Sequence, residues 1–450
     1  NLKRTALSCT LLTTLLTSAN AAKDINAGNH NAFAVNGETV TIKSGATVGV
    51  GRAQVGNAVS SNSSIVVSNN GNTNESSITI EKGGRLNSRI FSSYQAKIKD
   101  IIINGSIGAG PSNASIINFR GTTIEKIEVG TTGVLEGGII NSWFQNAGIT
   151  SGNSKINSID IKGEVKGGIK NQSGTMQTIS ITGSVSGGIQ NDDTMDTLKI
   201  ENGGSVSGDI INNKTMQSIS VSNGTVNGNI VNSGSNASTG AINITGTSDI
   251  KGSIVNQNGA TFNNQITLEQ GSKLGGISNT QGSTMSGTLT LNGEVGTITN
   301  AGKFDSTLTL SNKVGEINNA EGGTISNDIT INQNGSVGAI NNSGTMQAIT
   351  NNGTTGTLTL TNSGGTIDKI TNGNGATATI RNQGKITNGI INNGGTLTVF
   401  NDFRKDESAT NGYHTIGEIG KTANGVHIEN NNGGKLHLNA WYFNKEDFTT

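Results

Sequence analysis

A three-residue phrase recurs through the middle of the chain: an aliphatic residue, any residue, and then asparagine. It first appears in its regular form as Ile169-Lys170-Asn171, and the steps from one asparagine to the next are 20, 21, 20, 24, 23 and 21 residues. The seven asparagines are Asn171, Asn191, Asn212, Asn232, Asn256, Asn279 and Asn300. A period in this range is typical of stacked repeat architectures, in which each repeat covers the hydrophobic residues of its neighbours.

Two further apolar clusters keep the same phase within each repeat. A Met or Phe is followed by an alternating pair, as in Met176 with Ile179 and Ile181, and a lone aliphatic residue such as Val185 then follows glycine. Alternation with a period of two indicates strands with one buried face, and the Gly, Asn and Ser residues between them suit tight turns. The sequence therefore predicts an all-β fold, a right-handed single-stranded parallel β-helix (a solenoid) with three short strands per coil of about 20–23 residues.

The shared phase also predicts what lies inside the coils. We expect one interior column of stacked side chains after the Met/Phe position, formed by Ile181, Ile200, Val221, Ile244, Leu268 and Leu291. The recurrent asparagines are expected at a corner of the coil, where each side-chain amide bonds the asparagine one coil away, as in stacked amide ladders. After Asn300 the phrase is expected to continue through Asn319, Asn342, Asn372 and Asn392. We interpret these residues as structural.

The composition divides the chain into four segments. Residues 1–22 carry a basic start, an apolar stretch and the signal Ala19-Asn20-Ala21, which together predict a secretory signal peptide. Residues 23–97 are expected to form an N-terminal cap and irregular first coils, and 98–399 the regular coils. Residues 400–450 are richer in aromatics and are expected to form C-terminal coils or a cap, ahead of a barrel if the protein continues. The one cysteine, Cys9, lies in the signal segment, so the exported chain is expected to be stabilised by stacking alone.

One insertion interrupts the regular spacing. The step from Asn141 to Asn171 is 30 residues, and the excess contains the adjacent pair Trp143 and Phe144 in a chain with 3% aromatics. Insertions in a repeat array become loops on one face, which is often the binding face. Trp143 and Phe144 are therefore the candidate ligand-binding residues; the alternative is that both rings fold back and pack over a coil.

The charges and motifs favour a binding or structural protein. Thirty Lys and Arg balance thirty Asp and Glu, which gives no electrostatic argument for a nucleic-acid partner. The stretch Gly183–Gly187 has Val185 at its centre where a nucleophile elbow needs serine. We expect no catalytic residues, no metal site and no cofactor.

Two other functions use the same scaffold. One is a β-helix enzyme such as a polysaccharide lyase, which needs acidic and basic side chains converging in one groove. The other is an ice-binding protein, in which T-x-T pairs form a flat face. The pairs here are Thr288/Thr290, Thr307/Thr309 and Thr357/Thr359, and Lys199, Asn243 and Gln265 are expected to interrupt that face.

The signal peptide, the Asn/Gly-rich coils and the late aromatic segment together resemble the passenger domain of a bacterial autotransporter (type V secretion). This resemblance implies export through the periplasm and passage through an outer-membrane barrel with its assembly machinery. It further implies display at the cell surface, or release outside the cell, as an adhesin or virulence factor that binds a host-cell receptor or glycan. The sequence departs from a complete autotransporter because it contains no run of ten-residue alternating strands typical of a membrane barrel.

Overall fold

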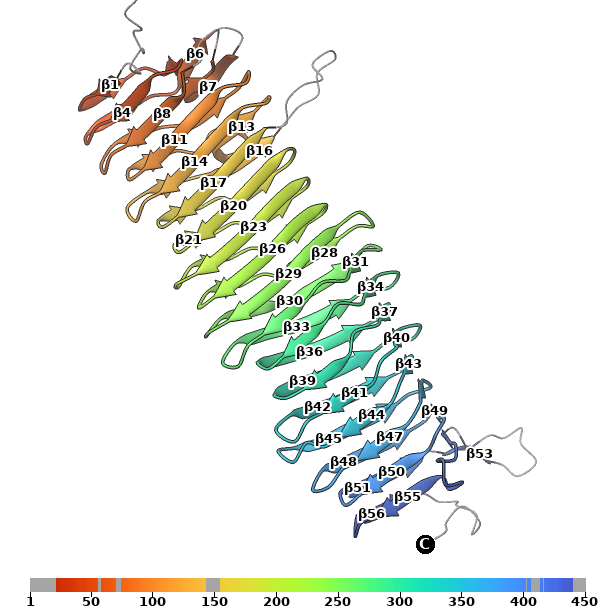
Figure 1. Ribbon diagram of the computed structural model, residues 1–450. Coiled ribbons are helices and arrows are strands. Elements are labelled where there is room, and N and C mark those ends of the chain that lie inside the picture. Colours follow the sequence, from red (N-terminus) through yellow and green to blue (C-terminus); the bar gives the residue numbers. More distant parts are fainter. Residues whose placement is uncertain are drawn as a thin grey trace, which may run out of the picture.

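The chain winds into an elongated parallel β-solenoid of about 17 turns, which confirms the predicted β-helix class (Figure 1). The computed structural model describes residues 22–55, 58–69, 74–142, 154–401, 403–405, 413–415 and 417–439. In these ranges the helical content is a single 3-10 turn, Pro111–Asn113. No helix of the described ranges is long and apolar enough to cross a membrane.

A typical coil contains three strands, as predicted. In one coil these are β20 (Thr175–Ile181), β21 (Ser184–Val185) and β22 (Ile189–Asn191). Each pairs in parallel with its counterpart in the next coil, so β20 pairs with β23 (Thr194–Glu201) and β22 with β25 (Ile210–Asn212). Burial alternates along most of the short strands, as in β22 and β25, because successive side chains of an extended backbone point to opposite faces.

Stacking the coils produces three long sheets of 18, 28 and 8 strands. In the 18-stranded sheet the strands are β1 (Ala22–Ile25), β4 (Thr39–Ile42), β8 (Ser76–Ile80), β11 (Lys97–Ile103), β14 (Thr123–Val129), β17 (Lys155–Ile161), β20, β23, β26 (Thr215–Ser222), β29 (Ser238–Thr245), β32 (Ile266–Leu268), β35 (Leu289–Leu291), β38 (Leu308–Leu310), β41 (Ile329–Ile331), β44 (Ile349–Asn351), β47 (Ile370–Asn372), β50 (Ile390–Asn393) and β55 (Ile428–Asn431). In the 8-stranded sheet they are β31 (Thr261–Phe262), β34 (Thr284–Met285), β37 (Lys303–Phe304), β40 (Thr324–Ile325), β43 (Thr345–Met346), β46 (Thr366–Ile367), β49 (Lys385–Ile386) and β54 (Glu418–Ile419).

The position of the long strand changes halfway along the rod. In the N-terminal half the first strand of the coil is the long one, as in β20. From β31 onward the first strand is split into two, whereas the second and third strands run together as one long strand, as in β36 (Glu294–Asn300). In the first of these coils the split coincides with one extra residue, because Phe262 and Ile266 are four residues apart whereas Met176 and Ile179 are three apart. An extra residue without a partner interrupts a strand locally.

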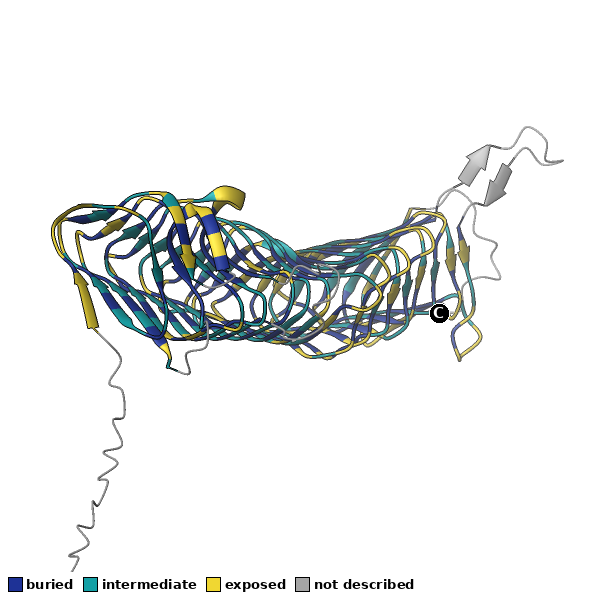
Figure 2. Ribbon diagram, turned by 90° about the horizontal axis from the view of Figure 1, so that it is seen from above, coloured by how far each residue is buried: buried dark blue, intermediate teal, exposed yellow. Residues whose placement is uncertain are grey.

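The interior is a continuous stack of aliphatic side chains. Buried residues recur from coil to coil along the whole rod (Figure 2). The predicted column is confirmed: Ile181, Ile200, Val221, Ile244, Leu268 and Leu291 are each in register with the next. Their exposed fractions are 0–2%. Each fully buried aliphatic side chain contributes about 1.5–3 kcal/mol. The six residues of this column together therefore stabilise the rod more than any single polar contact on the rod surface.

The first coils carry an antiparallel hairpin on their outer face. It consists of β6 (Gly51–Val55) and β7 (Ala58–Val67). Its Ala53 and Ala58 pack against Val66, which points outward and is nevertheless fully buried. A second antiparallel pair, β52 (Phe403–Lys405) with β53 (Tyr413–Thr415), lies at the other end of the rod.

Candidate ligand-binding face

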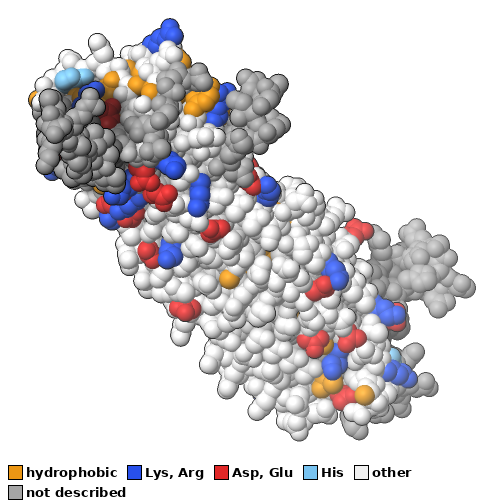
Figure 3. Space-filling model, turned by 45° about the horizontal axis from the view of Figure 1, so that its top comes forward, with side chains coloured by type: hydrophobic (Ala, Val, Ile, Leu, Met, Phe, Trp, Pro, Cys, Tyr) orange, Lys and Arg blue, Asp and Glu red, His pale blue; other side chains and the backbone are white. Residues whose placement is uncertain are grey.

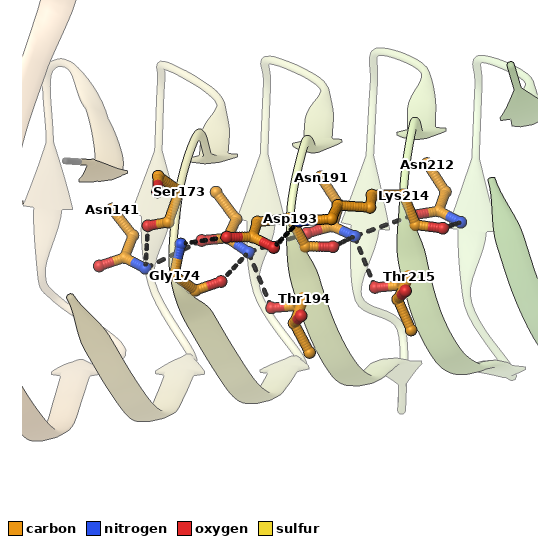
Figure 4. A network of polar contacts seen from close by, with 10 residues as sticks. Asn141, Ser173, Gly174, Asn191, Asp193, Thr194, Asn212, Lys214 and Thr215 are labelled. Carbon is orange, nitrogen blue, oxygen red and sulfur yellow. Dashed lines mark hydrogen bonds and ion pairs between the residues drawn. The ribbon is translucent and has the colours of Figure 1, made fainter. Parts of the chain in front are cut away.

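The seven predicted ladder asparagines lie in one buried column with exposed fractions of 0–2%. Figure 4 shows part of this column around Asn191 and Asn212. Asn171 shows the arrangement. Its Nδ2 donates to Asn191 Oδ1 at 2.9 Å, to the Gly174 carbonyl at 3.1 Å and to the Thr194 carbonyl at 2.7 Å. The amide therefore closes the turn of its own coil and links it to the next. Since its donors are used internally, this column is structural and presents nothing to a ligand.

The column contains one bridging side chain that the spacing does not reveal. Asn212 does not bond Asn232 directly. Its Nδ2 donates to Thr239 Oγ1 at 2.9 Å, and that hydroxyl donates to Asn232 Oδ1 at 2.9 Å. Thr239 occupies the place that Met216 fills one coil earlier, so a polar residue reaches the corner there. The direct ladder resumes from Asn232 to Asn256, Asn279 and Asn300.

The predicted continuation through Asn372 and Asn392 is wrong. The first ladder continues through Asn319, Asn342, Asn362, Asn382 and Asn401. Asn372 and Asn392 belong to a second ladder that begins at Asn351 and ends at Asn430. This ladder is in register with Ile331, so it replaces the aliphatic column described above. The error arose because late coils contain the same aliphatic-x-Asn phrase on two different strands.

Trp143 and Phe144 lie outside the described residues, and the structure places only the base of their insertion. β16 (Gly138–Ser142) precedes it and β17 follows it. The two ends are joined by a hydrogen bond from Ser154 Oγ to the Ser142 carbonyl at 3.0 Å. Ser142 is in register with Phe119, the last residue of β13 (Ala114–Phe119). The described base of the insertion therefore lies directly beside Phe119.

Phe119 is part of an outer cluster that we call the aromatic–arginine patch: Phe91, Tyr94, Phe119, Arg89 and Arg120. The ring centroids of Phe91 and Phe119 are 5.9 Å apart. The Arg120 guanidinium lies 5.0 Å from the Tyr94 ring centre and 5.3 Å from that of Phe119, and its Nη1 donates to Tyr94 Oη at 2.5 Å. The three rings are partly exposed. The sequence signal for this patch was missed because its aromatics come from separate coils.

Two features set the patch apart from the rest of the surface. Tyr94, Gln95 and Arg120 have positive φ values of 56°, 58° and 52°. Left-handed backbone is uncommon for bulky side chains and tends to occur at functional positions. Arg89 is held by Ser63 Oγ and the Pro111 carbonyl, and burial lowers the pKa of its guanidinium. A partly desolvated cation interacts more strongly with an incoming anion than a fully hydrated one.

A groove continues from the patch toward the middle of the rod. It has a volume of about 460 Å³ and crosses five coils, from Ser112 and Asn113 to Asp209 and Ile211. Ile140 lies in its floor and packs in the same apolar cluster as Phe91 and Phe119, which connects the two features. Lys166 and Lys170 lie along it.

Two carboxylates on the outer face of the neighbouring 18-stranded sheet, Glu128 and Asp160, form ion pairs with lysines. Glu128 accepts from Lys126 at 2.5 Å and from Lys162 at 2.9 Å, and Lys162 also lies 3.2 Å from Asp160. These lysines, Lys126 first, hold the pKa of the Glu128 carboxyl below its usual value. On the face shown in Figure 3, charged side chains gather toward the two ends of the rod and the middle is mostly uncharged. A polysaccharide lyase would need acidic and basic side chains to converge in a groove. The ion pairs around Glu128 and Lys162 instead lie on an outer strand face.

The T-x-T pairs do not share one face, contrary to the expectation. Thr290 and Thr309 lie on the 18-stranded sheet, in a column with Thr267, Thr330, Thr350 and Thr371. Thr357 and Thr359 lie on the 28-stranded sheet, in β45 (Thr357–Asn362). There they pair with Thr377 and Thr379, and those pair with Thr396 and Thr398. The double threonine array thus spans three coils before Lys435 and His437 replace it.

In the part of the chain that the structure describes, no group of three or more His, Cys, Asp or Glu side chains is placed to hold a metal ion. No protein-family model matches this sequence, and no curated protein matches it significantly.

Proposed function

We propose that the chain is the passenger of a bacterial autotransporter, displayed at the cell surface as an adhesin. In this proposal the chain is exported through the periplasm with the help of an outer-membrane barrel and its assembly machinery. Its partner is a host-cell receptor or glycan, and its role is binding rather than catalysis.

The observation that carries the proposal is the aromatic–arginine patch at the base of the 143–153 insertion. Regular β-solenoid faces are polar and repetitive, so specific recognition needs a local departure with rigid anchors. Aromatic and arginine side chains are the residue types enriched at binding hot spots. The patch combines them with left-handed backbone and with the longest interruption of the repeat between Asn118 and Asn342.

The test separates binding from folding. Bacteria that display the wild-type chain are compared with bacteria that display Phe91→Ala with Tyr94→Ala, or Trp143→Ala with Phe144→Ala, in a host-cell adhesion assay. Thr290→Ala with Thr309→Ala, on another face, is the matched control. We expect the first two variants to lose adhesion at wild-type surface levels and the control to keep it. Full adhesion by both patch variants would refute the proposed site, and full adhesion by bacteria lacking the whole chain would refute the function.

A further inference from the structure

The groove beside the patch has an unusual hydrogen-bonding pattern along its wall. In each coil the residue before the third strand turns its carbonyl toward the preceding coil. The carbonyl oxygens of Gly168, Gly188 and Asp209 accept from the N–H groups of Ile139, Ile169 and Ile189 at 3.0, 3.0 and 2.8 Å. Their own N–H groups then need acceptors from elsewhere.

Two later coils show what such an N–H group binds. The N–H of Asn229 donates to Asp209 Oδ1 at 2.7 Å, and the N–H of Ser253 donates to Asn229 Oδ1 at 2.9 Å. In both cases a side-chain oxygen from the preceding coil supplies the acceptor. The position therefore accommodates a carboxylate oxygen, and the chain itself demonstrates the contact.

Three consecutive coils lack that side chain. The N–H groups of Gly168, Gly188 and Asp209 face Gly138, Gly168 and Gly188 of the preceding coil. An ideal Cβ on those glycines would lie only 3.2, 3.4 and 3.3 Å from the three nitrogens. Among the contacts of the described residues, none gives these three N–H groups an acceptor. They line the groove and are left for water or a ligand.

The charges along the groove favour an anion at its N-terminal end. Lys170 is exposed in the groove and forms no ion pair among those of the described residues. Lys166 is close by and is paired with Glu136 at 2.8 Å. Arg89 and Arg120 follow in the adjoining patch. Asp209 gives the opposite charge at the far end, so an anion is favoured beside Lys170 and disfavoured at Asp209.

We infer that the groove binds a linear polysaccharide of carboxylate-bearing sugars, which lies along the rod with its carboxylates on the row of N–H groups. Successive units of an extended 1,4-linked pyranose chain are about 5 Å long and face opposite ways, so carboxylates on one side recur about every 10 Å, which is close to two coil spacings of ~4.8 Å. An extended acidic peptide would present carboxylates on one face only every ~6.8 Å, which does not match the row. Aromatic rings of the patch then stack on sugar faces further along the same chain. This inference deepens the proposed function. It rests on that proposal for the claim that the groove binds its polysaccharide at a cell surface.

The test uses the purified full chain and size-fractionated oligogalacturonides, with affinity measured by calorimetry. Lys170→Gln is expected to weaken binding by roughly two- to fivefold, as for an exposed charge pair. Asp209→Asn keeps the Oδ1 acceptor for Asn229 and removes a negative charge, so it is expected to strengthen binding. Lys199→Gln makes the same charge change as Lys170→Gln on the 18-stranded sheet and is the matched control, with no expected effect beyond that of net charge. Carboxyl-reduced oligomers are expected not to bind.

A second readout follows the N–H row itself. Millisecond hydrogen exchange is expected to slow at residues 166–170 and 187–190 when oligogalacturonide is added, and to stay unchanged in the exposed turn at residues 202–203. The inference is overturned if Lys170→Gln and Lys199→Gln weaken binding equally, if exchange in the groove is unaffected, or if poly-glutamate binds the groove as tightly. Because no cells are involved, loss of adhesion with intact uronate binding would refute the proposed function alone.

Discussion

The replacement of Asn279 by alanine tests whether the amide ladder stabilises the rod. Asn279 is fully buried. Its Nδ2 donates to Asn300 Oδ1, the Lys303 carbonyl and the Ser283 carbonyl at 2.9, 2.9 and 3.2 Å, and its Oδ1 accepts from Asn256 at 3.0 Å. Four hydrogen bonds at about 0.5–1.5 kcal/mol each give an upper range of about 2–6 kcal/mol.

The neighbouring contacts narrow this range. Asn256 keeps acceptors in the Ala260 and Thr284 carbonyls, and Asn300 Oδ1 still accepts from the Gly302 N–H. Few polar groups are therefore left unpaired, and we expect the free energy of local unfolding to fall by about 2–4 kcal/mol. Because coils contact only their neighbours, the loss should be confined to the adjacent coils rather than spread over the rod.

Hydrogen exchange measured peptide by peptide is the suitable assay, since a long repeat array does not unfold in one step. A loss of this size corresponds to faster exchange by about 30- to 700-fold in coils 256–303. Asn292→Ala, at an exposed turn position one coil further, is the control and should change exchange there less than about twofold. Exchange in Asn279→Ala that matches the control would refute the stabilising role of the ladder. Acceleration along the whole rod would refute the nearest-neighbour reasoning.

Three further predictions concern the same scaffold. Thr239→Val removes the hydroxyl that joins Asn212 to Asn232 and should lower local stability, measured by hydrogen exchange, by about 1–3 kcal/mol. Thr239→Ser keeps the hydroxyl and should lower it by less than half as much. Gly187→Ala places a Cβ 2.5 Å from the Gly168 nitrogen and should destabilise its coil by about 1–3 kcal/mol, measured by the same exchange experiment. Gly356→Ala is the control, since its Cβ would lie 3.5 Å from the nearest atom, and it should leave stability nearly unchanged. Glu128 has a folded pKa below its usual 4.5, so its contribution to stability is present above that pH and is lost as the pH falls through the lower folded value. Wild type should therefore exceed Glu128→Gln in thermal stability at pH 7 and lose that advantage on acidification toward pH 3; an equal advantage at both pH values would contradict the ion-pair assignment.

The sequence was sufficient for the fold because the interior of a solenoid is periodic. One phase, set by Met176, Ile179 and Ile181, determines which side chains point inward in every coil, and the register of the column through Leu291 follows from it. The sequence was insufficient where one phrase fits two positions. Ile370-Thr371-Asn372 reads like an element of the first ladder, yet the true member is Asn362, which follows Leu360 at the same offset. Thr239 was hidden for a related reason, because it bridges the ladder from a position that is apolar in the coils before and after it.

The binding face was harder to predict because it depends on lateral neighbours rather than on the period. Phe91, Ile117 and Ile140 stand at equivalent outward positions of three coils, and the next coil replaces them with Lys170. In the sequence, each of these residues looks like an ordinary outward-facing residue of a strand. In the structure they stack one coil apart and form an apolar strip that ends at the Lys170 cation. The same stacking places the N–H groups of Gly168 and Gly188 in line with that cation along the groove. A solenoid therefore converts substitutions that are about 20 residues apart in sequence into neighbours along one line, and this makes a linear, regularly charged polymer a better geometric match to the groove than a compact ligand.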